Sequence, residues 1–240
     1  MHFRLMTYNI HKGIGGVDRR YRPDRIVATI ARYRPDIVFL QEVDDGVPRS
    51  RFDRLLDLLG DALDFRHRAF QRNVILRRGC YGNAILSRFP LSDVHVVDLT
   101  IPLKKRRQAL VAHCRLRWEQ TRTILLFNVH LGLAGFERVI QLRKILSSEA
   151  LKHTHKSTAT IVGGDFNDVW GSLGKSILEP EGFIAGLETT KTFPAILPMR
   201  PLDRVYFRGG LKLDHSFASR TKLSQHASDH LPVILDFVAE

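Results

Sequence analysis

Short apolar runs rich in Val, Ile, Leu and Phe follow one another along most of the chain. Turn-forming residues bound these runs, which is the pattern expected of β-strands. A fold dominated by β-sheets is therefore expected. The expected strands are Arg4–Ile10, Asp36–Leu40, Asn83–Leu86, Val94–Leu99, Ala109–Leu116, Thr123–Val129, Thr158–Val162, Arg204–Phe207 and Leu231–Phe237.

A few segments carry their apolar residues at helical spacing instead. Pro23–Arg34 places Ile26, Ile30 and Tyr33 on one face, and a proline suits the first turn of a helix. The same spacing predicts helices over Arg51–Leu63 and Phe136–Leu151. We find neither a linker nor an internal repeat. The pattern predicts one α/β domain over residues 1–240, with two sheets and helices outside them.

The composition excludes several classes of protein. With 44% hydrophobic and 26% charged residues among 240, the chain is neither disordered nor of low complexity. No apolar run approaches the ~18 residues of a membrane span, and the start lacks the pattern of a signal peptide. The two cysteines, Cys80 and Cys114, are expected to be free thiols. We expect a cytoplasmic monomer without a transmembrane segment.

The charge balance is strongly positive. The chain has 37 Lys and Arg residues against 25 Asp and Glu, a formal net charge of +12. A field of that sign attracts polyanions such as nucleic acid or an anionic membrane surface. The alternative is a generally basic proteome, so charge alone leaves the partner open.

Polar residues stand where the apolar runs end or begin. Strand ends can converge on one edge of a sheet, so these residues could share a single cleft. Taken one at a time, each has a plainer explanation as a turn former, a solvated loop carboxylate or a core histidine. Their joint occurrence favours the cleft. The residues are Asn9, Gln41 and Glu42, His130, Asp165 with Asn167, and Asp229 with His230.

The chemistry of these side chains is consistent. Glu42, Asp165, Asp229 and the carbonyl of Asn9 are hard oxygen donors, which suit Mg²⁺ or Mn²⁺ better than zinc or copper. Histidines beside such an ion can donate hydrogen bonds or transfer protons near neutral pH. A basic surface next to a Mg²⁺ site points to phosphoester chemistry.

The ordered motifs resemble those of the endonuclease/exonuclease/phosphatase superfamily, and most closely those of a compact bacterial subgroup of it. The resemblance runs from Tyr8 to Pro232 and implies a four-layer sandwich of two face-to-face β-sheets flanked by helices. The motifs are Tyr8-Asn9-Ile10, Leu40-Gln41-Glu42-Val43, Asn128-Val129-His130-Leu131, Gly164-Asp165-Phe166-Asn167, Leu202-Asp203-Arg204-Val205 and Ser228-Asp229-His230.

The resemblance implies roles for individual residues. Asn9 and Glu42 would hold the divalent metal, with Asp229 as a second or alternative ligand. Catalysis would fall to His130, Asp165, Asn167, Asp203 and His230. In that set Asp165 orients or deprotonates the attacking water, Asn167 and His130 donate to phosphoryl or leaving-group oxygens, and Asp203 pairs with His230. Whether Asp165 or His230 is the general base stays open.

Two further residues are candidates for substrate contact. Arg107, or its neighbour Arg106, falls where relatives place a phosphate-binding arginine, although Lys104–Arg107 could equally be a solvated loop. Asn83 is expected either beside the catalytic histidine or in a turn. The Gly13–Gly16 segment lacks the ending of a phosphate-binding loop and is interpreted as a flexible loop, where His11 and Lys12 could touch substrate.

Three functions compete at this point. The leading one is a Mg²⁺-dependent phosphodiesterase, with Mn²⁺ as a substitute, that cleaves DNA by in-line attack of water. The alternative is a phosphoesterase for phospholipid head groups or small phosphorylated molecules, with anionic lipid as its partner. A non-catalytic binding protein is the third. Val169-Trp170 and Phe193-Pro194 could form an apolar wall for a base or an acyl group, or belong to the core.

Overall fold

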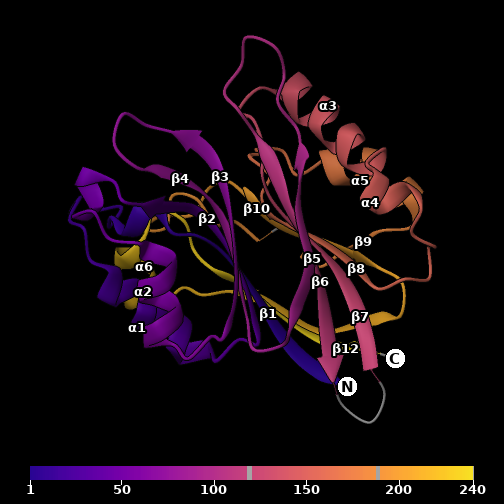
Figure 1. The fold of residues 1–240 in the computed structure, drawn as a ribbon, viewed down its shortest axis with the longest axis horizontal. Helices are drawn as coiled ribbons and strands as arrows, with labels where there is room; N and C mark the ends of the chain where they lie inside the picture. The colour runs from indigo at the N-terminus through magenta and orange to yellow at the C-terminus, as the bar shows by residue number, and fades with distance from the viewer. Residues whose placement is uncertain (118–120, 188–189, 240) are drawn as a thin grey trace.

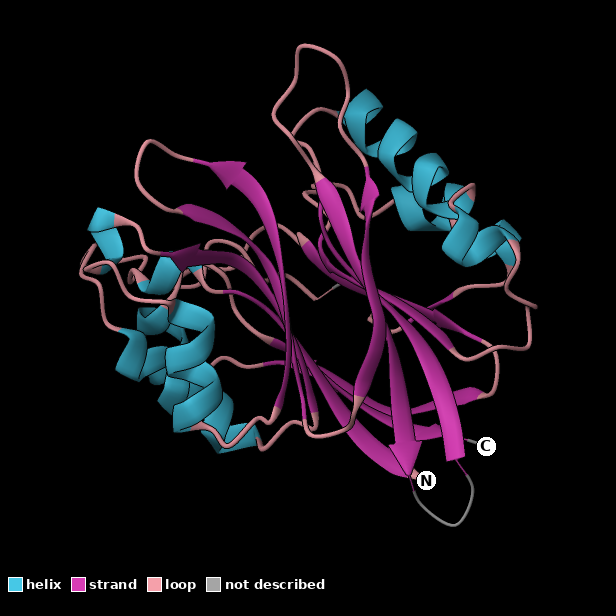
Figure 2. Ribbon diagram, in the orientation of Figure 1, coloured by secondary structure: helices cyan, strands magenta, loops and turns pink. Residues whose placement is uncertain are grey.

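The computed structural model describes residues 1–117, 121–187 and 190–239. Within that part of the chain, two six-stranded sheets pack face to face and helices cover both outer faces (Figures 1 and 2). The strand order is β11-β12-β1-β2-β4-β3 in the first sheet and β5-β6-β7-β8-β10-β9 in the second. This arrangement confirms the expected four-layer sandwich.

Both sheets are mixed, with parallel and antiparallel neighbours. The first sheet contains β1 (His2–Asn9), β2 (Ile37–Asp45), β3 (His67–Ile75), β4 (Cys80–Ser87), β11 (Leu211–Ala218) and β12 (Val233–Ala239). The second contains β5 (Leu91–Asp98), β6 (Gln108–Arg117), β7 (Thr121–His130), β8 (Thr160–Asp165), β9 (Ile184–Ala185) and β10 (Asp203–Arg208). The parallel pairs are β1 with β2 and β7 with β8.

The helices divide between the two outer faces (Figure 1). Those over the first sheet are α1 (Pro23–Tyr33), α2 (Leu55–Ala62) and α6 (Lys222–Ala227). Those over the second are α3 (Gly135–Leu146), α4 (Glu149–Lys152) and α5 (Leu173–Ile177). Short 3₁₀ turns are η1 (His11–Gly13), η2 (Pro48–Ser50) and η3 (Glu179–Glu181).

The main core lies between the two sheets. The ring of Phe237 packs on Phe3 at 5.3 Å and on Phe207 at 5.1 Å between centroids, which joins the sheets through aromatic contacts. Further apolar layers lie between each sheet and its helices. The two ends of the chain meet, because the amino group of Met1 donates to the carbonyl of Ala239 at 2.9 Å.

The sequence pattern missed β3, β9 and β11. All three are edge strands of their sheets, and edge strands need not be apolar on both faces. Charged residues in His67–Ile75 and Leu211–Ala218 therefore obscure the alternation of apolar and polar residues that is typical of a strand. The other strands are found with shifted ends.

Two of the predicted helices are wrong in extent. The segment Arg51–Leu63 is helical only from Leu55, because Arg51 and Phe52 adopt left-handed backbone with φ of 57° and 63°. The segment Phe136–Leu151 is interrupted after Leu146 and resumes as the short α4. The sequence pattern also missed the later helices α5 and α6. The helix at Pro23 is confirmed and ends at Tyr33.

The structure also bears on smaller expectations about the glycine segment, Asn83, the cysteines and membrane spans. In the segment Gly13–Gly16, Gly13 closes the 3₁₀ turn η1 and the backbone N–H of Gly15 donates to the carbonyl of Arg20 at 3.0 Å; its flexibility remains a prediction. Asn83 lies inside β4, so the turn alternative was wrong. Both cysteines are free and buried, as expected. No helix in the described ranges is long and apolar enough to cross a membrane.

Candidate active site

The polar ends of the strands meet at one rim of the sandwich, remote from the chain termini (Figure 1). Strands β1, β2, β7 and β8 end there, while β10 and β12 run antiparallel to their neighbours β8 and β1 and start there. In register, Asp165 stands opposite both His130 and Asp203. Sheet topology thus gathers residues from six separate segments of sequence.

The carboxylate of Asp165 is the centre of this group. Its Oδ2 accepts a hydrogen bond from Asn9 Nδ2 at 3.0 Å, and this bond joins the two sheets. The Nε2 atoms of His130 and His230 lie 3.5 and 3.8 Å from the same oxygen. Oδ1 accepts the backbone N–H of Asn167 at 2.9 Å. A single buried carboxylate therefore faces one amide and two imidazoles.

Backbone geometry fixes the direction of Asp165. The preceding Gly164 has φ of 142°, and a Cβ there would lie 2.0 Å from the carbonyl oxygen of Val129, so only glycine fits. Asn167 has φ of 50°, which asparagine tolerates better than most residues. Its Nδ2 donates to the carbonyl of Leu131 at 2.9 Å and keeps one amide hydrogen for another acceptor.

Asp203 and His230 form a buried pair. Asp203 Oδ2 accepts the Nδ1–H of His230 at 2.8 Å, and the ring of Phe193 packs on the imidazole at 4.9 Å. Burial lowers the pKa of His230, but the negative charges of Asp203 and Asp165 outweigh it and raise the pKa to about 10. The ring is therefore a cation at neutral pH.

The other two titratable groups of the centre differ from His230. Burial, together with the charge of Arg107, lowers the pKa of His130 well below its usual range, so this imidazole stays neutral. Burial raises the pKa of Asp165 to about 6, while the positive charge of His230 opposes that rise. The Asp165 carboxylate is thus ionised at neutral pH but close to its titration range.

Glu42 enters the site through a β-bulge. The register between β2 and β4 shifts between Leu40 and Val43, and Glu42 has a left-handed φ of 59°. Its carboxylate contacts the ammonium of Lys12. Burial disfavours the charge of Glu42, yet nearby positive charge lowers its pKa to about 2. Because His130 is neutral, the positive charge that lowers the pKa of Glu42 comes from the ammonium of Lys12.

The 3₁₀ turn η1 contacts the other two predicted metal ligands. The backbone N–H of His11 donates to Asn9 Oδ1 at 3.1 Å, and the Nε2 of its ring lies 3.8 Å from Asp229 Oδ2. Asn9, Glu42 and Asp229 therefore all lie against the His11–Lys12 turn. These three residues, grouped by their contacts with the turn, make up one corner of the site.

This corner suits a divalent cation of the hard type. It offers two carboxylates and an amide carbonyl, and the Lys12 ammonium on Glu42 shows that a positive charge is stabilised there. In the described part of the chain no three His, Cys, Asp or Glu side chains are placed to hold one ion. Mg²⁺ needs no such cluster, because it keeps waters and shares substrate oxygens.

Arg107 lies close to these anionic groups but has no direct partner among them. It is only 5% exposed, and its Nε is buried with no hydrogen-bond partner in the described structure. Burial lowers its pKa, while the charges of Asp165 and Glu42 act in the opposite direction. A buried guanidinium with an unused Nε donor can bind an anion such as phosphate.

We expect Arg107→Met to separate activity from stability. The loss of one charged donor to the phosphate should lower kcat/KM about 100-fold. The free energy of unfolding should stay unchanged or rise, because an incompletely satisfied buried charge is removed. The measurement pairs a phosphodiesterase assay with thermal unfolding. Arg106→Met, at an exposed neighbour, should change neither. A similar loss of activity in both variants would contradict a specific role for Arg107.

The remaining predicted residue, Asn83, is separated from solvent. It is fully buried on β4, and its Nδ2 donates to the carbonyl of Gln108 at 3.3 Å, next to Arg107. Its side chain supports the start of β6, whereas the Nε2 of His130 faces Asp165. A substrate contact by Asn83 remains a prediction.

Several supporting residues received no role from the sequence. Gln41 Nε2 donates to Asn128 Oδ1 at 2.7 Å, while Asn128 Nδ2 donates to the carbonyls of Leu40 and Ala84. This buried network bridges the two sheets just beneath Glu42 and His130. Ser228 Oγ donates to the carbonyl of Asn9 at 2.7 Å. In the sequence, Gln41 and Asn128 could have been recognised as polar residues inside apolar strands.

A two-sheet sandwich with carboxylates and histidines on one rim defines a class of phosphoester-hydrolysing proteins. The profile of the Endonuclease/Exonuclease/phosphatase family matches residues 6–230, so the chain belongs to this family. Members of the family hydrolyse phosphoester bonds with a divalent metal, and the chain is an enzyme of this type.

One sequence relative and two solved structures are similar to the chain over nearly its whole length. Protein YbhP of Escherichia coli K12 is 28% identical over 249 residues, covering 96% of this chain and 94% of the relative. Among solved structures, an endonuclease/exonuclease/phosphatase from Beutenbergia cavernae has a TM-score of 0.81 and 22% identity, covering 99% and 72% of the two chains. The mannosyl-6-phosphatase Bt3783 of Bacteroides thetaiotaomicron has a TM-score of 0.74 and 17% identity, covering 98% and 99%. These two structures share the fold.

Proposed function

We propose that the enzyme is a Mg²⁺-dependent phosphodiesterase that cleaves DNA by in-line attack of water on phosphorus. The observation that carries this proposal is the Asp165 carboxylate, which faces His130 and the Asp203–His230 pair beside an acidic, metal-suited corner. Glu42, Asn9 and Asp229 would hold the metal. When bound, it would neutralise negative charge on the phosphoryl group.

The protein residues divide the proton transfers between them. Asp165, ionised at neutral pH, accepts the proton of the attacking water as the general base. His230 cannot take that role while it is a cation, and instead donates to the oxygen on which negative charge develops. Asn167, His130 and Arg107 supply the remaining donors. As the bond between phosphorus and the leaving oxygen breaks, that oxygen takes a proton from His230.

The rate of hydrolysis should fall at both low and high pH. We expect kcat/KM to rise as pH increases through about 6, where Asp165 loses its proton, and to fall toward about 10, where His230 loses its own. Initial rates between pH 5 and 10 measure this. Asp203→Asn removes the main charge that raises the pKa of His230, so the alkaline limb should move to lower pH. A profile that is flat from pH 5 to 8 would contradict this assignment.

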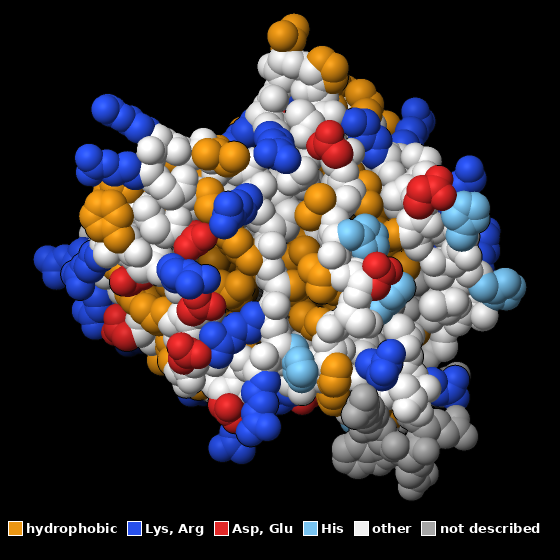
Figure 3. Space-filling model, in the orientation of Figure 1, with side chains coloured by type: hydrophobic (Ala, Val, Ile, Leu, Met, Phe, Trp, Pro, Cys, Tyr) orange, Lys and Arg blue, Asp and Glu red, His pale blue; other side chains and the backbone are white. Residues whose placement is uncertain are grey.

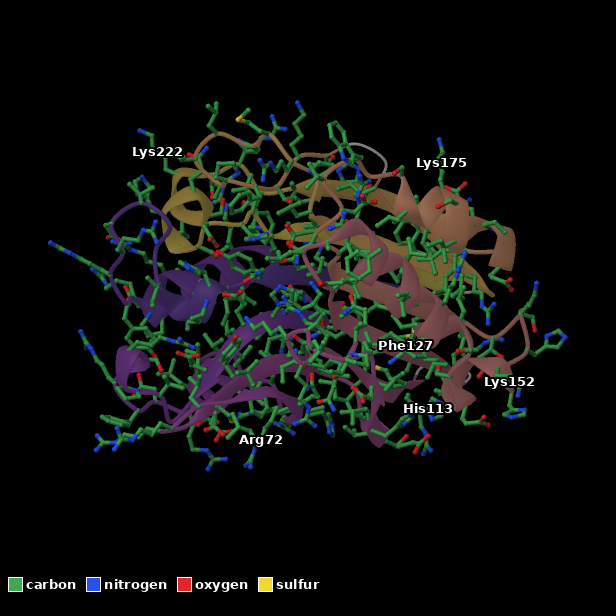
Figure 4. All side chains as sticks on the ribbon, turned by 90° about the horizontal axis from the view of Figure 1, so that it is seen from above. Arg72, His113, Phe127, Lys152, Lys175 and Lys222 are labelled. Carbon is green, nitrogen blue, oxygen red and sulfur yellow. The ribbon has the colours of Figure 1, made fainter. Side chains whose placement is uncertain are left out.

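DNA is the proposed substrate because the enzyme combines a phosphoesterase site with a net charge of +12, which attracts polyanions. Basic side chains spread over the visible face of the molecule rather than forming one stripe (Figure 3). Lys175 and Lys222 lie along one long side in the view from above, and Arg72 along the other (Figure 4). A panel of single-stranded, duplex and abasic oligonucleotides with Mg²⁺ or Mn²⁺ tests the proposal. No cleavage of any of them would exclude DNA.

A second candidate substrate is the head group of an anionic phospholipid. The observation that favours it is the loop after Phe193, where Ile196, Leu197 and Met199 are 53, 66 and 63% exposed. Exposed apolar side chains near basic ones suit the surface of an anionic bilayer. Release of phosphate or head group from anionic vesicles, without cleavage of oligonucleotides, would decide for this substrate.

A further inference from the structure

One cavity of the described structure lies away from Asp165, which is not among its lining residues. It occupies about 550 Å³ on the outer side of β10, between α5 and the loop that precedes β10. That volume is in the range of small-molecule binding pockets. Its lining includes Trp170, Lys175, Glu179, Lys191, Met199 and Arg204.

Each side of this cavity is continuous with a segment of the candidate active site. Trp170 follows Asn167 by three residues on the loop after β8. Arg204 follows Asp203 on β10, with its side chain on the cavity side. Lys191 and Met199 belong to the loop that carries Phe193 onto the ring of His230. A molecule bound here would touch the same three segments that hold the reacting groups.

The lining combines an aromatic surface with positive charge. Trp170 is 85% exposed, so its indole face is available to a planar ring. Gly171 has φ of 67°, and a Cβ there would lie 1.9 Å from a guanidinium nitrogen of Arg204, so glycine allows the loop to approach β10 closely. Three cationic residues and one carboxylate, Glu179, line the cavity among the described residues. Lys175 projects from α5 at the edge of the molecule (Figure 4).

We infer that this cavity binds an unpaired base of a nucleic-acid strand, next to the phosphate that is cleaved. The inference rests on the proposed nuclease function and narrows it to strands with single-stranded character. The base stacks on Trp170, because stacking on an aromatic side chain accepts any base. Lys175 and Lys191 attract the adjoining phosphates. A base in a duplex is held in the stack and cannot enter.

The polar parts of the lining favour a base over an acyl chain. Glu179, Ser172 and the hydroxyl of Tyr206 offer acceptors and donors for the edges of a base. An acyl chain would cover Glu179 and the Tyr206 hydroxyl without offering them hydrogen bonds, at a cost in free energy. The exposed apolar loop at Ile196 and Leu197 lies outside the cavity lining. Binding of a bilayer rather than of a base is the competing outcome of the test.

Tryptophan fluorescence reads this site directly. The chain contains two tryptophans, Trp118 and Trp170, so Trp118→Phe leaves Trp170 as the only emitter. An eight-nucleotide single strand, added in EDTA to prevent cleavage, should quench the emission saturably. The matching duplex should quench it much less. Vesicles of anionic phospholipid serve as the third probe, and inorganic phosphate alone as the fourth, which should leave the emission unchanged.

Binding of the labelled single strand to variants supplies the second measurement. Trp170→Ala should weaken it about tenfold, since the stacking of the base on the indole is lost. Trp170→Phe should retain most of the affinity, and Phe52→Ala, which removes an exposed aromatic ring that does not line the cavity, should leave it unchanged. Equal binding by the Trp170→Ala variant would overturn the inference.

The outcomes separate this inference from the proposed function. If oligonucleotides are cleaved but never quench Trp170, the cavity does not bind a base and the nuclease function stands. If the single strand quenches Trp170 but no oligonucleotide is cleaved with any metal, the nuclease proposal fails and base binding is supported. If only vesicles change the emission, the cavity is part of a lipid-binding surface and the inference is wrong.

Discussion

Replacing Asp165 by Asn should lower kcat about 10³- to 10⁴-fold, which corresponds to roughly 4–5 kcal/mol of lost transition-state stabilisation. The amide keeps the size of the side chain but cannot accept a proton from water. Asparagine also replaces one carboxylate oxygen by an NH₂ donor. In the native enzyme, Asn9 Nδ2 and the Nε2 atoms of His130 and His230 all approach Asp165 Oδ2. Single-turnover rates with saturating Mg²⁺ measure the chemical step apart from product release.

Asp168→Asn is the matched control, three residues along the same loop. Asp168 is equally buried, but its Oδ2 accepts the backbone N–H of Leu173 at the start of α5. Asparagine can accept that bond as well, so we expect a rate within a few-fold of the native enzyme. Comparable losses in both variants would mean that the loop, rather than the Asp165 carboxylate, was disturbed.

Glu42→Gln is expected to give the second large effect, through the metal. Glu42 is one of two carboxylates at the candidate metal corner, so the substitution halves the charge available to a divalent ion. We expect the Kd for Mn²⁺ to rise by about 100-fold or more, since even groups behind metal ligands affect affinity by roughly 10- to 100-fold. Electron paramagnetic resonance of free Mn²⁺ measures the Kd without any assay of activity.

Activity should fall with this loss of affinity and recover in part at high metal concentration. Asp45→Asn is the control, because Asp45 lies at the end of the same strand and contacts Arg54 and Cys80 instead. It should bind Mn²⁺ as the native enzyme does. Unchanged Mn²⁺ affinity in Glu42→Gln would remove Glu42 from the ligand set and shift the assignment to Asn9 and Asp229.

The apolar runs of the central strands predicted two sheets with helices outside them, and the family resemblance implied their face-to-face packing. Such runs are buried on both faces, as in Thr160–Asp165 between its neighbours in the second sheet. Edge strands such as Leu211–Ala218 escaped because one face meets solvent. The start of the helix at Leu55 was misplaced because the spacing of leucines does not register the left-handed residues Arg51 and Phe52.

The candidate site was predictable as a set of residues but not as an arrangement. Polar residues at strand ends indicated which side chains would meet, since the ends of neighbouring strands share an edge. The β-bulge that turns Glu42 into the site leaves no mark in the sequence. The position of Lys12 on Glu42 and the exposed face of Trp170 also required the structure.

The sequence by itself determined the family, most of the strands along the chain and the chemical types gathered at their ends. These properties depend on residue identity and on patterns within a few positions. Tertiary structure decided which atoms face one another, such as Asn9 and Asp165, which are 156 residues apart in the chain. It also decided which histidine carries a charge, because burial and the neighbouring carboxylates fix the pKa of His230 and His130 in opposite directions.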